Sequence, residues 1–165
     1  MAVLKVLTYP DPRLKTISVP VEAFDEKLRA FVRDLEETMR AGPGGVGIAA
    51  PQVGEFTRVV IVDVSIKKNV AHHGRMLLVN PEIVLWEDMA VGREGCMSVP
   101  DYTGNVIRAQ RIQVAARNEH GDAVHYECTG YEARAVQHEL DHLDGMLFLD
   151  RLVSRRHDLF ARIKK

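Results

Sequence analysis

The chain has 165 residues, a formal net charge of −1 at pH 7, 46% hydrophobic residues and 27% charged residues. These values are ordinary for a globular protein, so we expect a single domain over residues 1–165. No apolar run approaches the roughly 18 residues of a membrane span, and residues 1–12 lack the basic-then-apolar pattern of a signal peptide. We therefore expect a cytoplasmic protein without a membrane partner. Its two cysteines, Cys96 and Cys128, are too few for a disulfide framework.

The first quarter of the chain predicts one helix after an irregular arm. Three prolines between residues 8 and 21 predict the arm. Asp25 is suited to cap a helix that runs to about Ala41, and Gly42-Pro43 ends it. Spacing predicts a buried stripe on this helix made of Leu28, Phe31, Val32, Leu35 and Met39.

The segment after this helix, residues 42–47, reads G-P-G-G-V-G and formally matches the G-x-G-x-x-G of dinucleotide-binding loops. That function requires a preceding strand, whereas this segment follows a helix and contains a proline that removes one backbone N–H. We therefore reject dinucleotide binding. Glycines here are better suited to bring the backbone close to a substrate.

The middle of the chain predicts short strands. Residues 58–64, 76–79, 83–86 and 91 onward are rich in β-forming residues, and residues 65–75, with His72 and His73, read as an exposed loop. Residues 111–117 and 123–128 flank five turn-forming residues and predict a hairpin, with Cys128 as a small core residue. A helix, then many short strands, then helices predicts an α+β fold with antiparallel strands.

Residues 138–142 carry an H-E-x-x-H motif. On a helix, His138 and His142 lie about 40° apart, one turn from each other, so both can reach one metal ion. Glu139 lies to the side and can move a proton without binding the metal. Asp141 flanks the pair equally closely on the other side, but its shorter side chain makes Glu139 the better candidate. The alternative is a surface helix with two incidental histidines.

The helix that carries this motif has recognisable ends. Thr129 and Glu132 have the spacing of a capping box, and Gly145 is a natural stop. Two histidines do not complete a metal site, however. Downstream, Phe148 stands where a metzincin has its third histidine, and no glutamate follows His142, as a thermolysin-like site requires. The search for a third ligand therefore turns upstream, to residues 94–98.

These motifs together resemble the peptide deformylase family. Its three motifs, G-x-G-[IL]-A-A-x-Q, E-G-C-[LM]-S and Q-H-E-x-D-H, are matched by residues 45–52, 94–98 and 137–142 in family order. The resemblance covers nearly the whole chain. It implies antiparallel β-sheets packed around a central helix bearing H-E-x-x-H, with an N-terminal helix. To this we add a short C-terminal helix from Ser154 to Lys165.

The resemblance implies a metal site formed by Cys96, His138 and His142, with a fourth position left for water. We expect Fe²⁺ in the cell, with Zn²⁺, Ni²⁺ or Co²⁺ as alternatives. The implied substrate is an N-formylmethionyl nascent peptide. Metal-bound hydroxide would attack its formyl carbon and release formate while Glu139 transfers the proton.

The resemblance also implies the groups around the reacting atoms. The Gln52 side chain and the backbone N–H of Met97 would stabilise the oxyanion. Thr103 stands where some relatives have a substrate-contacting arginine, so that contact is not carried over, and Arg108 is not offered in its place. The expected substrate-binding residues are Val46, Gly47, Ile48, Glu94, Tyr131 and Arg134. Of these, Val46 and Ile48 would form the pocket for the methionine side chain. Glu94 could instead orient a metal ligand without touching the substrate.

Two other functions remain open. One is an H-E-x-x-H metallopeptidase that cleaves ordinary amide bonds. The other is a metal-stabilised binding module, which would need a fourth protein ligand. No DNA partner is expected.

The C-terminal end carries an excess of positive charge. Residues 151–165 hold six of the 22 Lys and Arg residues and one of the 23 acidic residues. The simple explanation is a solvated basic end near a helix C-terminus. A sharper hypothesis is that this tail contacts ribosomal RNA near the tunnel exit.

Overall fold

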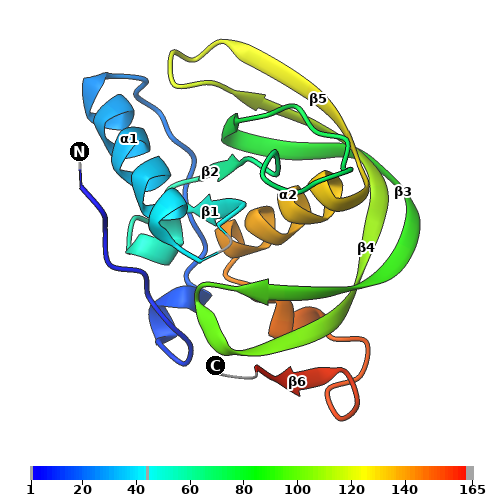
Figure 1. Cartoon of the computed structure of the whole chain (residues 1–165). Coiled ribbons are helices and arrows are strands. Elements are labelled where there is room, and N and C mark those ends of the chain that lie inside the picture. The colour runs from blue at the N-terminus through cyan, green and yellow to red at the C-terminus, as the bar shows by residue number, and fades with distance from the viewer. Residues whose placement is uncertain (1, 44, 163–165) are drawn as a thin grey trace.

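The computed structural model describes residues 2–43 and 45–162, and it has the predicted α+β architecture (Figure 1). Two α-helices and six strands make up the regular structure of these residues, together with three short 3-10 helices. The helices are α1 (Glu26–Ala41) and α2 (Gly130–Leu143), with 3-10 helices η1 (Pro12–Lys15), η2 (Ala50–Val53) and η3 (Phe148–Arg151). The strands are β1 (Gly47–Ala49), β2 (Val59–Val62), β3 (Met76–Cys96), β4 (Val99–Arg117), β5 (Ala123–Thr129) and β6 (Leu159–Ala161).

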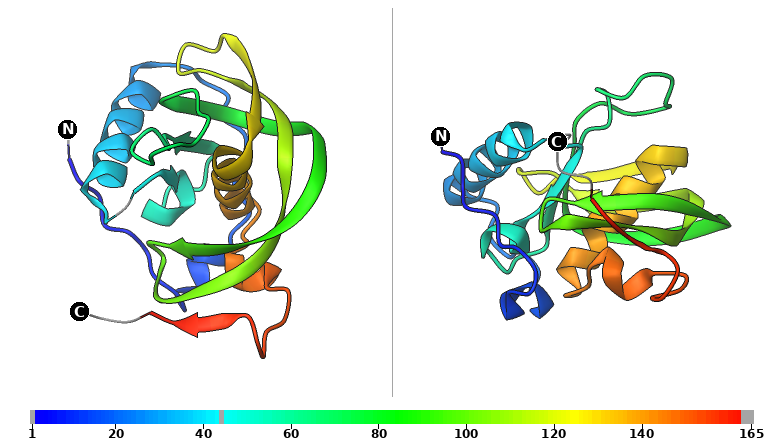
Figure 2. Two further views of the ribbon diagram at one scale, coloured as in Figure 1. Left: turned by 45° about the vertical axis from the view of Figure 1, so that its right-hand side comes forward. Right: turned by 60° about the horizontal axis from the view of Figure 1, so that its bottom comes forward.

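The strands are antiparallel neighbours in the order β1-β2-β3-β4-β5, and β6 pairs with β4. The prediction of separate short strands between residues 76 and 96 is wrong, because these residues form the single strand β3. Register shifts interrupt its pairing with β4 at three places without ending it. Such irregularities bend a strand, and the left view in Figure 2 shows β3 and β4 curving around α2. The predicted hairpin at residues 111–128 is confirmed as the pairing of β4 with β5.

The strands β1 and β2 form a layer between the two helices. Alternate residues of a strand face opposite sides. Ile48, Val59 and Ile61 accordingly pack with α1, whereas Val60 and Val62 pack with α2. Two hydrophobic cores result, one on each side of this layer.

The N-terminal helix α1 matches its prediction. The Asp25 side chain accepts a hydrogen bond from the backbone N–H of Leu28 at 3.0 Å, and the helix ends at Ala41 before Gly42. The predicted stripe packs against the β1–β2 layer, with Phe31 only partly buried and the other members buried: Leu28, Val32, Leu35 and Met39.

The helix α2 is central and buried along most of its length, including every residue from His138 to Leu143. It ends as predicted, with Gly145 in the left-handed conformation at φ 73°. The predicted capping box does not form. The Thr129 side chain makes no capping hydrogen bond, and the Glu132 carboxylate instead accepts bonds from the His73 backbone N–H at 2.7 Å and contacts its Nδ1. His73 is exposed, as predicted for a surface residue, and its contacts with Glu132 connect its loop to this helix.

The predicted C-terminal helix is wrong within the described residues. Residues 155–157 form a turn, and β6 follows and pairs with residues 102–104 of β4. The edge of β4 offers unpaired backbone groups at this place, and that pairing outweighs the helix propensity of the segment. Residues 163–165 lie outside the described part of the chain. No helix within residues 2–43 and 45–162 is long and apolar enough to cross a membrane.

Candidate metal and active site

Three candidate metal ligands meet beside the central helix. Cys96 ends β3, and His138 and His142 lie one turn apart on α2. One ligand atom from each residue lies within 4.8 Å of the other two, and the Cys96 Sγ is 3.4 Å from the His142 Nε2. A thiolate and two imidazoles are a donor set that suits a divalent transition metal.

The electrostatics of these residues favour a cation among them. Burial and the positive charges of His138 and Arg108 lower the pKa of His142 well below its usual value, so that its imidazole is neutral and able to bind metal. Burial would lower the pKa of His138 too. The hydrogen bonds of His138 to Cys96 and Glu94 outweigh this effect of burial, however, and raise the pKa of His138 well above its usual value. The surroundings of His138 therefore attract positive charge, which a divalent metal would supply.

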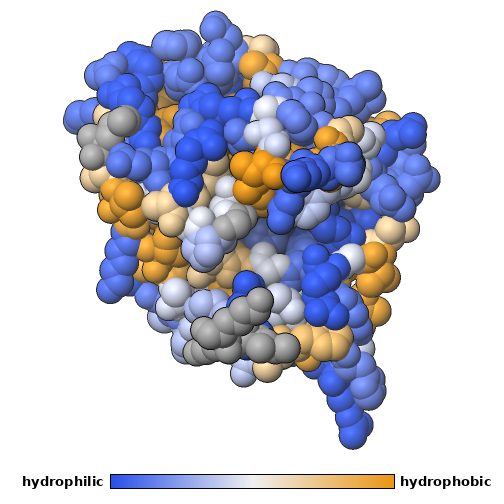
Figure 3. All heavy atoms as spheres, in the orientation of Figure 1, coloured by the Kyte–Doolittle hydropathy of each residue, from blue (hydrophilic) through white to orange (hydrophobic). Residues whose placement is uncertain are grey.

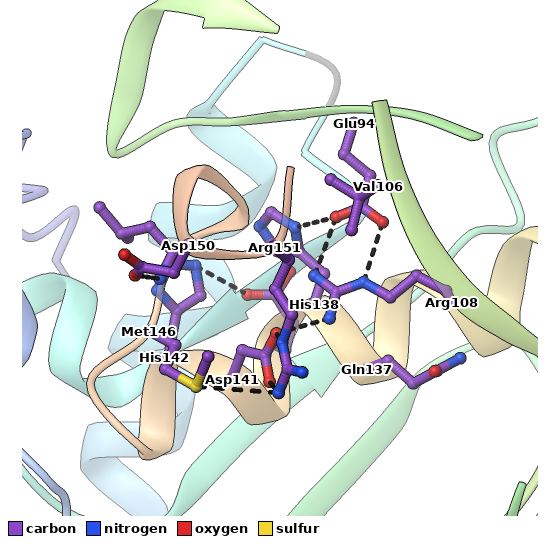
Figure 4. A network of polar contacts seen from close by, with 12 residues as sticks. Glu94, Val106, Arg108, Gln137, His138, Asp141, His142, Met146, Asp150 and Arg151 are labelled. Carbon is purple, nitrogen blue, oxygen red and sulfur yellow. Dashed lines mark hydrogen bonds and ion pairs between the residues drawn. The ribbon is translucent and has the colours of Figure 1, made fainter. Parts of the chain in front are cut away.

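Glu94 holds His138 in place (Figure 4). Its Oε1 lies 2.9 Å from the His138 Nδ1, which leaves the other ring nitrogen for the metal. Arg108 contacts both carboxylate oxygens at 3.0 Å, and Arg134 contacts Oε2 at 2.6 Å. Burial opposes ionisation of Glu94, but its hydrogen bonds to His138 and Arg108 prevail and lower its pKa to about 2. Its carboxylate is thus occupied by protein partners.

Asp141 belongs to the same network and points away from the ligands. Its Oδ2 contacts the Arg108 Nη1 at 2.5 Å and the Arg151 Nε at 3.0 Å. Helical spacing alone placed Asp141 and Glu139 equally close to the histidines, and in the structure the Asp141 carboxylate is bound by Arg108 and Arg151. The contacts of Arg108 and Arg151 with Asp141 were not predicted from the sequence. A signal for Arg108 exists, because it shares the inward face of β4 with the buried Val106, two positions before it.

Glu139 is the free carboxylate of the site. It is 5% exposed, its Oε1 has no hydrogen-bond partner within the described chain, and that atom lies 3.9 Å from the His142 Nε2. Burial raises its pKa to about 7. The backbone of β1 passes directly beside it, since a Cβ atom on Gly47 would lie only 2.5 Å from the Glu139 Oε2. Gly47 therefore leaves room for the Glu139 carboxylate.

Gln52 presents its amide N–H₂ to the site. Its Oε1 accepts a hydrogen bond from the Ala49 backbone N–H at 2.9 Å, which fixes the orientation of the amide. Its Nε2 then donates to the Ser98 Oγ at 3.0 Å and lies 3.6 Å from the Cys96 Sγ. Met97 follows Cys96 in the turn between β3 and β4 and lines the cavity described below. Ser98 is a further site residue that the sequence analysis missed.

A cavity of about 710 Å³ opens onto these residues. Of the expected substrate-binding residues, Ile48 does not line it, because its side chain is fully buried on the α1 side of β1. Arg134 reaches the cavity but is held by Glu94 and by the carbonyls of Ala90 and Val106. On the molecular face in Figure 3, apolar residues form separate patches among hydrophilic ones. The cavity wall includes Val46, Gly47, Gln52, Cys96, Met97, Tyr131, His138 and Glu139.

Comparisons with known proteins agree with this geometry. The family model described as Polypeptide deformylase matches residues 3–158. A peptide deformylase of Desulfotalea psychrophila is 40% identical over 166 aligned positions, which cover 100% of this chain and 97% of the relative. One of Caldicellulosiruptor bescii is 43% identical, covering 93% and 87%. The crystal structure of a peptide deformylase from Legionella pneumophila superposes with a TM-score of 0.86 at 38% identity, covering 94% of this chain and 90% of that one.

Proposed function

The chain belongs to the polypeptide deformylase family, which removes the formyl group from nascent peptides, and we propose that Cys96, His138 and His142 hold its catalytic metal. The observation that carries this proposal is the arrangement of the three donor atoms within 4.8 Å beside the unpaired Oε1 of Glu139. Three protein ligands leave a coordination position open, as catalysis requires, whereas a purely structural site has four. We propose Fe²⁺ as the metal in the cell, with Zn²⁺, Ni²⁺ or Co²⁺ as substitutes.

When bound by Cys96, His138 and His142, a divalent cation would supply Lewis acidity and would lower the pKa of a water molecule to about 7. Glu139 is placed to take a proton from the attacking water through its free Oε1 and to deliver it to the amine nitrogen of the methionine. A carbon–oxygen bond forms at the formyl carbon and the carbon–nitrogen bond breaks, which gives formate and a free N-terminus. The Gln52 Nε2 and the Met97 backbone N–H are the donors for the developing oxyanion.

The walls of the cavity receive the peptide. Val46, Gly47 and Tyr131 line it beside Glu139 and form the proposed pocket for the methionine side chain. Glu94 and Arg134 act through their mutual ion pair rather than through the substrate, because both are held by protein partners. This assignment replaces the direct substrate contacts that the sequence led us to expect.

One pair of peptides tests the reaction. Formyl-Met-Ala-Ser should yield one formate per peptide and leave Met-Ala-Ser intact, whereas acetyl-Met-Ala-Ser should remain unchanged. A metallopeptidase acting on ordinary amide bonds would instead cut within both peptides, which mass spectrometry detects. Glu139→Gln should retain its metal and lose a factor of about 10²–10⁴ in rate, because the proton carrier is gone. Loss of metal equal to that of His138→Ala would contradict the role of Glu139.

The partner that presents the substrate is the second part of the proposal. Nascent chains emerge from ribosomes, so we place the enzyme in the cytoplasm, near the tunnel exit. Arg155, Arg156 and Arg162 are exposed cations of the basic end, and the first two support ribosome contact, whereas Arg151 is bound to Asp141. Lys164 and Lys165 lie outside the described residues. Co-sedimentation with ribosomes across a salt series tests this, and equal binding by wild type and an Arg155→Gln/Arg156→Gln double variant would contradict it.

A further inference from the structure

We propose that the cavity prefers formylated peptides that carry a carboxylate within the few residues after the methionine. The proposal rests on the function proposed above. Three cations on the cavity wall, Lys67, Arg93 and Arg162, carry it, and we call them the cationic rim. They come from the loop after β2, from β3 and from the residue after β6, so three distant segments bring the same charge to one place.

The cationic rim faces no lining carboxylate that is free to neutralise it. Among the described residues, the acids that line the cavity are Glu94 and Glu139. Glu94 is bound by Arg108, by His138 and by Arg134, the fourth cation on the wall. Glu139 is buried beside the metal ligands. The positive charges of the cationic rim are therefore not neutralised by the acidic residues of the cavity wall.

Arg162 lies beside the residue that precedes Cys96. Its guanidinium lies over Gly95, directly before the Cys96 ligand, where a Cβ atom would come within 2.6 Å of the Arg162 Nη2. The small Thr103 side chain borders the same spot, with its Cγ2 at 3.4 Å. The Arg162 backbone is anchored by a 2.8 Å hydrogen bond to the Asp101 carbonyl. Within residues 2–43 and 45–162 no hydrogen bond or ion pair engages its guanidinium, and the Arg162 side chain lines the cavity.

Arg93 and Lys67 have neutral partners. The Arg93 guanidinium stacks 3.8 Å from the centre of the Phe160 ring and donates to Asn105 at 3.1 Å. The Lys67 Nζ lies 5.8 Å from the centre of the Tyr131 ring. Aromatic rings and amides orient cations without cancelling their charge. All three members of the cationic rim thus keep their positive charge for a ligand.

A peptide carboxylate fits this arrangement. Guanidinium groups bind carboxylates through two parallel hydrogen bonds, and neighbouring cations strengthen the attraction. The rim is open to solvent, so each pair contributes modestly and is weakened by salt. We expect the preference to lie in KM, with about a fivefold advantage in kcat/KM for an acidic residue over its neutral isostere at low salt.

The experiment compares formyl-Met-Ala-Asp with formyl-Met-Ala-Asn, both as C-terminal amides, and formyl-Met-Asp-Ala with formyl-Met-Asn-Ala. At least one Asp peptide should exceed its Asn partner about fivefold in kcat/KM, and this ratio should approach one in high salt. The ratio should also fall toward one in Arg162→Gln. Arg111→Gln is the matched control, because Arg111 is exposed on β4 outside the cavity wall, and it should keep the wild-type ratio.

The ratio of kcat/KM for an Asp peptide to that for its Asn partner, measured within one variant, separates a change in specificity from a general loss of activity. Equal kcat/KM for every Asp and Asn pair in the wild type would overturn the proposal, and so would a wild-type ratio in Arg162→Gln. An absence of formate release from all four peptides would instead refute the proposed function itself, which keeps the two failures distinguishable.

Discussion

The Oε1 of Glu94 lies 2.9 Å from the Nδ1 of His138, although the two residues are 44 positions apart in the sequence. Glu94 stands two residues before the cysteine ligand, so one short segment supplies both a ligand and the group that orients another. Arg108 then joins this pair to Asp141 on the next turn of α2. The proposed metal ligands thus rest on a buried ionic network that connects β3, β4 and α2.

Glu94→Gln tests the orienting role. The amide keeps the size of the side chain but loses its charge, so His138 is held less firmly and Arg108 and Arg134 lose their shared partner. We expect metal affinity to fall by about 10- to 100-fold, as for other groups that orient a ligand. Competition with a chelator measures it. Glu127→Gln, at a part of β5 distant from the ligands, is the control, and equal affinities in both variants would refute the role.

Arg108→Met tests the network as a source of stability. The substitution fills similar space but leaves Glu94 and Asp141 without their common buried cation. Breaking a buried pair on one side costs about 3–5 kcal/mol, because the remaining charge is uncompensated. Denaturant unfolding should show this loss, whereas the exposed Arg111→Met on the same strand should change stability by less than about 0.5 kcal/mol. Similar midpoints for the two variants would show that the network contributes little.

Gly47→Ala tests the close approach of β1 to Glu139. The added methyl group would meet the Glu139 Oε2 at 2.5 Å, so the carboxylate must move. A displacement of about 1 Å can cost a factor of about 100 in rate. We expect kcat to fall by about that factor while metal content stays at the wild-type level.

Ile48→Val is the contrasting change at the next residue. Its side chain packs with α1 away from the cavity, so the variant should lose about 0.5–1.5 kcal/mol of stability and keep its KM. An unchanged rate in Gly47→Ala, or a raised KM in Ile48→Val, would reverse the assignment of these two positions.

The ion pairs of Arg40, which lie outside the proposed active site, should make the stability of the fold depend on pH. Arg40 pairs with Glu36 at 2.9 Å and with Asp63 at 3.1 Å. Burial alone would raise the pKa of both acids. Hydrogen bonds from Arg75 and Arg40 nevertheless lower the pKa of Glu36 below its usual value. Hydrogen bonds from Ser65 and Arg40 likewise lower the pKa of Asp63. A lowered folded-state pKa gives stability that is present above the unfolded-state value of about 4 and is lost as pH falls through the folded-state value.

The wild type should therefore exceed Arg40→Gln in unfolding free energy at pH 7 by at most about 1 kcal/mol, since Arg40 is partly exposed. The difference should shrink as pH falls from 5 toward 3. Urea unfolding at several pH values measures it. A difference that stays constant or grows in acid would show that these ion pairs do not stabilise the fold.

Local patterns predicted the parts of the site that depend on local geometry. His138 and His142 are neighbours because one helical turn separates them, and Glu139 follows from the same helix. The Asp25 cap and the Gly145 stop likewise depend on residues close in sequence. The network of Arg108, Asp141 and Arg151 could not be predicted in this way, because it requires the register of β4 against α2.

Contacts between residues distant in sequence explain why the C-terminal helix and the capping box were predicted wrongly. The last segment of the chain has a helical pattern, but the edge of β4 at residues 102–104 recruits it as β6. This pairing places Arg162 at the cavity, where a helix would not be expected to bring it. Glu132 was assigned to a capping box from its spacing to Thr129, yet the loop residue His73 competes for its carboxylate. In each case a partner distant in sequence decided the structure.

We propose that one metal ion, held by Cys96, His138 and His142, is required for deformylation. Titration of metal-free protein with Fe²⁺ under anaerobic conditions, with formate release from formyl-Met-Ala-Ser as the readout, tests it most directly. Activity should rise linearly, stop at one equivalent per chain, and stay near zero in Cys96→Ser, because a serine hydroxyl binds such metals far more weakly than a thiolate. Full activity without metal, or the same titration curve in Cys96→Ser, would contradict the account.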